Sequence, residues 1–181
     1  MTIPSVVAGA LIDPTVFGNA VVDAINSLLP GAANKSPAVK VKASAVQSVT
    51  TGTLTALVWD QEDFDTDSFH STSSNTSRLT VPTGLGGLYA VSFATYCAPA
   101  AAGCASAWVA KNGATNTPRF GVVQVASDSV NGVGFSGTDH LVLAAGDYVE
   151  LVAFQNSGSS KNFNLTSPYI GFFSMVRLGA S

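Results

Sequence analysis

Charged side chains are scarce in this chain. They make up 10% of its 181 residues, and Lys and Arg together number 8, whereas about a quarter of a typical soluble domain is charged. The basic residues form no patch with interleaved aromatic residues, which argues against nucleic-acid binding. The apolar runs are also far shorter than the roughly 20 residues that a membrane-spanning helix requires. A surface with so little charge is typical of a protein that is covered by partners or by its own copies.

Cysteine is scarce as well, with 2 residues in the chain. Cys97 and Cys104 flank CAPAAAGC, a turn-rich stretch between two runs typical of strands. They are therefore candidates for a disulfide that closes a hairpin. The alternative is a pair of reduced, small apolar residues, and the sequence leaves both open. Without further Cys or His ligands the two do not make a zinc site.

Motifs of catalysis are missing. The sequence contains no Gly-x-Ser-x-Gly elbow, no phosphate-binding loop and no His-Glu-x-x-His helix. His70 and His140 are far apart in the chain, and each is expected to be a surface or packing histidine. Glycoside hydrolysis needs two carboxylates on either side of a bond in a cleft, which carboxylates one or two residues apart on an open strand do not provide. We therefore expect that the protein is not an enzyme.

A helical period occurs in one stretch, DPTVFGNAVVDAINSLL at residues 13–29, where apolar residues recur three and four positions apart. Asp13 is a candidate N-cap, Pro14 suits the first helical position, and Pro30 with Gly31 ends the pattern. The sequence thus predicts a helix at about 14–29, followed by a linker rich in Pro, Gly and Ala. Residues 1–38 form a segment separate from the rest.

The apolar face of this helix has no second helix in the sequence to pack against. It can dock on another protein or pack on its own domain. Docking would make it an anchor, and the residues that would provide the contact are Val16, Phe17, Val21, Ile25 and Leu28.

From residue 39 to residue 181 the pattern is that of an all-β domain. Short runs of β-forming residues alternate with turn signals such as Asn112-Gly113 and Asn131-Gly132. So many short strands in one domain predict a two-sheet antiparallel jelly-roll sandwich. The predicted strands are 40–48, 53–59, 78–81, 87–97, 105–111, 119–126, 133–143, 147–155 and 169–178.

Several motifs in this domain carry a family resemblance. They are DFDTDSFH, SRLTVPTGLGGLYAVSF, WVAKNG, LVLAAGDYVELVAFQNSG and the closing YIGFFSMVRL. In this order they resemble the jelly roll of tumour necrosis factor and of the globular heads of complement and collagen-like proteins. The chain is most similar to the versions of that domain in virion proteins of tailed bacteriophages. The resemblance covers about residues 40–179.

The resemblance implies a tight homotrimer with apolar side chains along its three-fold axis. The positions that match the axis strands are Tyr89, Phe93, Tyr148, Phe172 and Phe173, and ordinary sandwich core is the alternative for them. It also implies that residues 1–35 attach the trimer to other proteins of the particle. The stretch with the two cysteines departs from the family pattern, so the resemblance does not define the structure of that rim of the domain.

The acidic stretch DQEDFDTDSFH raises a separate question. It holds Asp63, Asp65 and Asp67 at the spacing of a calcium loop, but an EF-hand also needs Gly and Glu where this chain has Ser68 and Ser74. A calcium site of another kind remains one alternative. The other, favoured by the resemblance, is an extended outer segment in which Phe64 and Phe69 point inward and the carboxylates face water or cap backbone amides.

Together these features predict a structural bacteriophage protein displayed on the virion surface. It is expected to be a tail or tail-tip component that can contact a glycan or protein of the host surface. A head fibre or capsid decoration protein is the alternative placement. A secreted glycan- or protein-binding module is the alternative from another class, although Pro4, Asp13 and Pro14 interrupt the apolar run that a secretion signal needs. Apart from the calcium alternative, no cofactor is expected.

Overall fold

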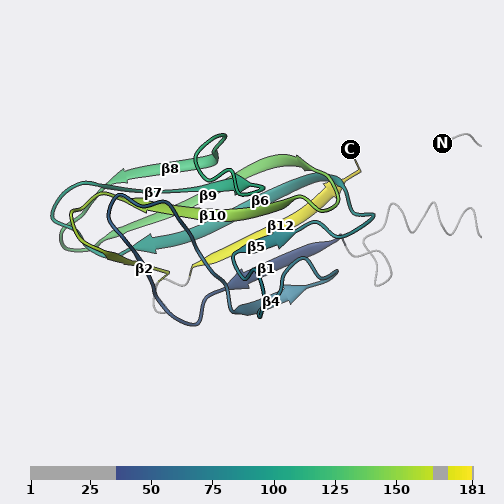
Figure 1. The fold of residues 1–181 in the computed structure, drawn as a ribbon, viewed down its shortest axis with the longest axis horizontal. Helices are drawn as coiled ribbons and strands as arrows, with labels where there is room; N and C mark the ends of the chain where they lie inside the picture. Colours follow the sequence, from purple (N-terminus) through teal and green to yellow (C-terminus); the bar gives the residue numbers. More distant parts are fainter. Residues whose placement is uncertain (1–35, 165–170, 181) are drawn as a thin grey trace, which may run out of the picture. The chain divides into compact units, whose positions relative to one another are not determined.

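The computed structural model describes residues 36–164 and 171–180. The chain divides into two compact units, residues 1–36 and 37–181, and the fold reported below is that of the second unit. The predicted helix at 14–29 and the five anchor residues lie outside the described residues. The described residues form twelve strands and contain no helix, and Figure 1 shows the fold. Among these residues there is thus no helix long and apolar enough to cross a membrane.

The strands form two antiparallel sheets. The seven-stranded sheet has the order β2-β11-β6-β12-β1-β4, and β9 pairs with β6. Its strands are β1 (Ala38–Lys42), β2 (Gln47–Val49), β4 (Gln61–Asp65), β6 (Gly87–Cys97), β9 (Val133–Leu143), β11 (Lys161–Phe163) and β12 (Phe172–Gly179).

The five-stranded sheet has the order β3-β10-β7-β8, and β5 also pairs with β10. Its strands are β3 (Thr55–Ala56), β5 (Arg78–Thr80), β7 (Cys104–Lys111), β8 (Phe120–Ala126) and β10 (Tyr148–Gln155). The prediction of an all-β, two-sheet jelly roll is confirmed.

The core lies between the two sheets and follows from the alternation of side chains along each strand. In β6, Tyr89, Val91 and Phe93 are buried, whereas the residues between them are only partly covered. Phe173 and Met175 of β12 are buried in the same cluster. The cluster also takes in Val149 and Leu151 of β10. Each such side chain stabilises the fold by about 1.5–3 kcal/mol when it leaves water.

The strand prediction differs from the structure in three places near the start of the domain, and in one of them the predicted strand 53–59 shortens to β3. The predicted strand 40–48 is interrupted, because β1 ends at Lys42 and β2 begins at Gln47. At the bend between them, the carboxylate of Asp60 accepts hydrogen bonds from the backbone N–H and the hydroxyl of Ser44. The acidic stretch itself forms a strand, β4, which pairs with β1. In Figure 1 these two strands lie side by side at the lower border of the domain.

The stretch with the two cysteines is not a two-stranded hairpin. Cys97 ends β6 in the seven-stranded sheet, and Cys104 begins β7 in the five-stranded sheet, so residues 98–103 cross from one sheet to the other. Both residues are free thiols in the structure. Burial raises the pKa of the Cys97 thiol to about 11, which keeps it protonated at neutral pH. The two residues thus do not close a hairpin, and a disulfide between them stays a prediction.

Candidate functional site

One side of the seven-stranded sheet faces away from the core. On three adjacent strands of this side, all of whose residues the structure describes, the outward side chains carry no formal charge. We call this surface the uncharged face. Its side chains come from alternate positions of β6, β9 and β12, and none is Lys, Arg, Asp or Glu. They are Leu88, Ala90, Ser92 and Ala94 of β6, Gly134, Ser136, Thr138, His140 and Val142 of β9, and Phe172, Ser174, Val176 and Leu178 of β12.

The register arranges these side chains in rows across the sheet. Val176 of β12 pairs with Ala90 of β6, which pairs with His140 of β9. In the next row Ser174 pairs with Ser92, and Ser92 with Thr138. The hydroxyls of this second row bond within the sheet: Ser92 Oγ lies 2.8 Å from Thr138 Oγ1, and Ser174 Oγ donates to the Ser92 carbonyl at 3.3 Å. Its polar groups are thus largely satisfied before any partner arrives.

The face combines small side chains with exposed apolar ones. Val142 and Leu178 are 63% and 53% exposed, respectively. Ala and Ser occupy the centre of β6, so the surface there is low and flat. Exposed apolar side chains beside small uncharged ones make this face a candidate binding surface. An edge strand as long as β9 normally carries charges that prevent pairing with other chains, yet its outward positions hold none.

Positive charges border the uncharged face but are already paired. Lys40 and Lys42 on β1 both form ion pairs with the Asp63 carboxylate, and the Lys40 distance is 3.2 Å. Hydrogen bonds from Lys42 and then Lys40 lower the pKa of Asp63. Lys40 Nζ also lies 5.1 Å from the centre of the Phe172 ring, within reach of a cation–π contact.

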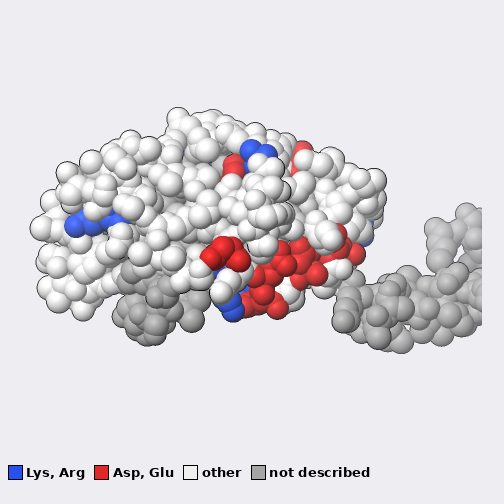
Figure 2. Space-filling model, turned by 60° about the horizontal axis from the view of Figure 1, so that its bottom comes forward, with Lys and Arg blue, Asp and Glu red and all other residues white. Residues whose placement is uncertain are grey.

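The second notable surface is the acidic edge, which we define as Asp60, Glu62, Asp63, Asp65 and Asp67. Figure 2 shows Asp and Glu side chains gathered in a red area along the lower right of the described domain, with Lys or Arg atoms in blue beside it. Each residue of the acidic edge has a partner inside the domain. Asp60, for example, is held by Ser44, whose hydrogen bonds lower the pKa of the Asp60 carboxyl.

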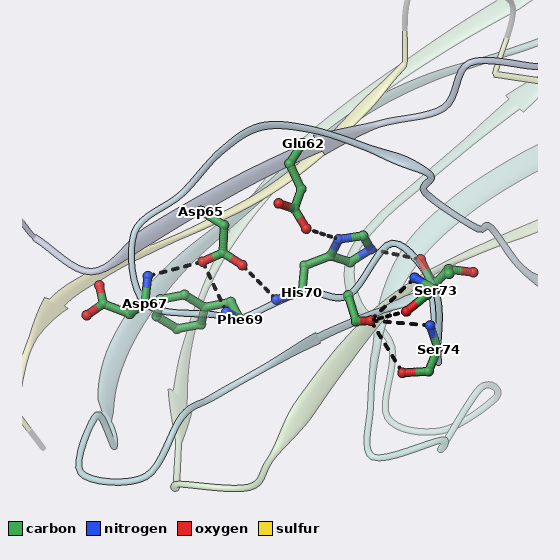
Figure 3. A network of polar contacts seen from close by, with 9 residues as sticks. Glu62, Asp65, Asp67, Phe69, His70, Ser73 and Ser74 are labelled. Atoms are coloured by element: carbon green, nitrogen blue, oxygen red, sulfur yellow. Dashed lines mark hydrogen bonds and ion pairs between the residues drawn. The ribbon is translucent and has the colours of Figure 1, made fainter.

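Asp65 organises the loop that follows β4. Its carboxylate accepts hydrogen bonds from the backbone N–H groups of Asp67 at 3.2 Å, Phe69 at 3.1 Å and His70 at 2.9 Å (Figure 3). This capping turns the chain inward, so that Phe69 is buried and packs edge-to-face against Tyr89 at 6.1 Å. The prediction that Phe64 points inward is wrong, because its side chain lies on the same side of the sheet as Lys40 and is 45% exposed.

The three carboxylates of the calcium alternative have separate partners. Asp63 pairs with the two lysines, Asp65 caps backbone amides, and Asp67 accepts a hydrogen bond from Thr66 Oγ1 at 2.5 Å. Within residues 36–164 and 171–180, no three His, Cys, Asp or Glu side chains are grouped so that they could hold a metal ion. The local role of these carboxylates is to fix β4 and its loop, and calcium binding stays a prediction.

The residues expected at a three-fold axis fall into three locations. Tyr89, Phe93 and Phe173 are fully buried in the core, so they have no surface with which to contact a second copy. Tyr148 lies on β10 of the other sheet, with the Arg78 guanidinium stacked 4.1 Å above its ring. Of the five, only Phe172 lies on the uncharged face.

Sequence reasoning favoured large aromatic side chains for contacts, and this is why it missed the uncharged face. Strand alternation sends Tyr89 and Phe93 of YAVSFATYC inward and leaves the small residues between and after them outside. The signal was present in the sequence as the alternate set Ala90, Ser92 and Ala94. A set of small uncharged residues on one side of a long strand could have been taken as a packing surface.

No protein-family model matches the sequence, and no curated protein matches it either. Solved structures do match. The globular domain of a zebrafish complement 1qA protein is 16% identical with a TM-score of 0.53, covering 80% of this chain and 99% of that one. Murine APRIL at pH 5.0 is 15% identical with a TM-score of 0.57, covering 80% and 100%.

The Eiger TNF of S. frugiperda is 16% identical with a TM-score of 0.52, covering 81% of this chain and 94% of that one. At these identities the likeness concerns the fold alone. The domain has the jelly-roll fold of the tumour necrosis factor and complement 1q globular domains.

Proposed function

We propose that this chain is a structural protein of a bacteriophage particle, displayed on the virion surface as a homotrimer that forms through the uncharged face. The observation that carries the self-association is the absence of charge on the outward side of β6, β9 and β12. The resemblance to the tumour necrosis factor and complement heads supplies the number of copies. No catalytic role is part of the proposal.

The physical case for this face rests on what burial would cost. Removing a charge from water without a partner is expensive, and this face has none to remove. Its serine and threonine hydroxyls already bond within the sheet. A stable interface buries about 800 Å² on each partner, an area that three neighbouring strands can supply. A three-fold ring is closed by heterologous contacts, in which the face of one copy meets a different surface of the next.

A single charge in the middle of the face tests the trimer. Val176→Asp places a carboxylate beside Ala90 and Ala38. We expect the dissociation constant of the assembly to rise about a hundredfold or more, since an unpaired buried charge costs several kcal/mol. Multi-angle light scattering behind a sizing column measures this as a shift from trimer to monomer.

The matched control is Val58→Asp, which adds the same charge at an exposed valine outside the uncharged face. Val58 is held through its backbone by the Gln47 side chain, so the fold should tolerate the change and the trimer should persist. A wild-type protein that runs as a single monomeric species would contradict the proposal directly. So would equal loss of trimer in both variants.

The virion role is supported by the sequence resemblance and by the apolar helical pattern of residues 14–29 with its contact residues Val16, Phe17, Val21, Ile25 and Leu28. Residues 1–35 would hold the trimer to other virion proteins, and the jelly roll would project and contact a host-surface glycan or protein. A tail or tail-tip position is favoured, with a head fibre or capsid decoration as the alternative placement.

Deleting residues 1–30 tests this attachment. We expect the truncated chain to fold and to trimerise but to be missing from purified particles, as judged by immunoblotting. Labelled electron microscopy of wild-type particles then distinguishes the tail from the head. Incorporation of the truncated chain at wild-type level would contradict the anchor, and a protein found only outside particles would favour a secreted binding module instead.

A further inference from the structure

The imidazole of His70 lies completely inside the domain, with a side-chain exposure of 0%. Its Nδ1 is 2.8 Å from Glu62 Oε1, and its Nε2 is 3.2 Å from the backbone carbonyl oxygen of Thr76 (Figure 3). A carbonyl oxygen only accepts hydrogen bonds, and so does an ionised carboxylate. A neutral imidazole has one N–H to donate, whereas the protonated ring has two. Both contacts therefore form together only when His70 carries a positive charge.

The charged groups near the His70 ring have other partners, except Glu62, which is the partner of the protonated imidazole. Among the described residues, His70 is the one ion-pair partner of Glu62. Asp65, also on β4, is directed at backbone amides, including that of His70 itself. Lys40 and Lys42 on β1 are engaged with Asp63. Arg78 on β5 is engaged with Glu150 at 3.4 Å and with the Tyr148 ring.

We propose that His70 is a pH-sensitive latch that fastens the edge strand β4 to the segment 71–77. In the protonated state the ring bridges Glu62 and Thr76, which belong to these two pieces of chain. When the proton leaves to solvent, one donor is lost and so is one of the two bonds. Water cannot replace it at a ring with no exposed surface.

The direction of the pH effect follows from linkage. The latched state binds one more proton than the unlatched state, so lowering the pH favours it and raising the pH weakens it. Among the described residues β4 pairs on one side only, with β1, so the strand that is released is at the border of the sheet. The latch is a property of a single copy and does not depend on the proposed trimer or virion role.

Amide hydrogen exchange of the full chain at pH 5.5 and pH 8.0 tests the latch, with each rate divided by its intrinsic rate at that pH. We expect protection of β4 and of residues 70–77 to fall about tenfold at the higher pH, the upper range for one hydrogen bond of ordinary net strength. Strand β8, in the other sheet, should keep its protection and provides the internal reference. Equal protection of β4 at both pH values would overturn the proposal.

Two variants assign the effect to this residue. His70→Gln removes the titrating ring, so protection of β4 should no longer change with pH. Asp63→Ala changes another residue of β4, whose partners are Lys40 and Lys42 and not His70, and should leave the wild-type pH step intact. A pH step that persists in His70→Gln, or one that disappears in Asp63→Ala, would contradict the latch. The wild-type comparison decides the question even if His70→Gln does not fold.

Discussion

The acidic edge and the uncharged face belong to the same sheet and use polar residues in opposite ways. At the acidic edge, the carboxylates of Asp60, Glu62, Asp63, Asp65 and Asp67 lie close together, and each has a partner within the domain. On the uncharged face, the outward positions of β6, β9 and β12 contain no formal charge at all.

The contrast shows that a dense cluster of acids need not be a site of chemistry. The carboxylates are occupied by lysines, hydroxyls, backbone amides and one histidine, so they stabilise local structure. The uncharged face is inconspicuous in the sequence, but Val142 and Leu178 on it are more than half exposed. In this domain the surface proposed to bind a second copy is the one that lacks charge.

The largest effect within the acidic edge is expected at Asp65, and it sharpens the contrast. Asp65→Ala leaves three backbone N–H groups without their acceptor and should lower the free energy of unfolding by about 2–3 kcal/mol. Asp63→Ala should lower it by less than about 1 kcal/mol, because it breaks surface ion pairs with two lysines. Urea unfolding at one fixed protein concentration measures both, so that mass action on an oligomer affects them equally.

Asp65→Asn is the conservative control, since its side-chain oxygen can still accept part of the capping bonds. It should fall between the wild type and Asp65→Ala. If Asp63→Ala proved as harmful as Asp65→Ala, the view of Asp65 as the organising residue of the loop would be wrong.

The smallest effect is expected from calcium. Because Asp63, Asp65 and Asp67 are directed at different partners, the ion would have to displace existing bonds to bind them. We expect the melting temperature to be the same with added calcium chloride and with a chelator. A concentration-dependent rise in the melting temperature with calcium would break the contrast and restore a metal site at this edge, because a ligand that binds only the folded state stabilises it.

Much of the fold could be predicted from the sequence because strand alternation and turn residues are local signals. Strand 87–97 and strand 133–143 were predicted with the bounds that the structure has. The sheet to which a strand belongs is a non-local property, and this is why the two cysteines looked like the base of a hairpin although β6 and β7 lie in different sheets. The bend at Ser44 was also beyond local signals, because it depends on Asp60.

The candidate site was predicted less well than the fold. Size and aromaticity directed attention to Tyr89, Phe93 and Phe173, which alternation places in the core. Phe64 was expected to point inward with Phe69, but the four residues between them include a turn in which Ser68 has a positive φ of 66°, and the two rings face different ways. Which partner an exposed surface meets depends on other molecules, and no single sequence contains that information.

The small side chains at the centre of β6 also determine which mutations the protein should tolerate. In a packed core, loss of volume is the damaging change because it leaves a cavity. In the proposed trimer the order is reversed at Ala90, Ser92 and Ala94: loss of a methyl group would matter little, whereas a gain in volume would hold a neighbouring copy away from the surface. Selection would therefore act in opposite directions at these three positions and at the buried Tyr89, Val91 and Phe93, which alternate with them.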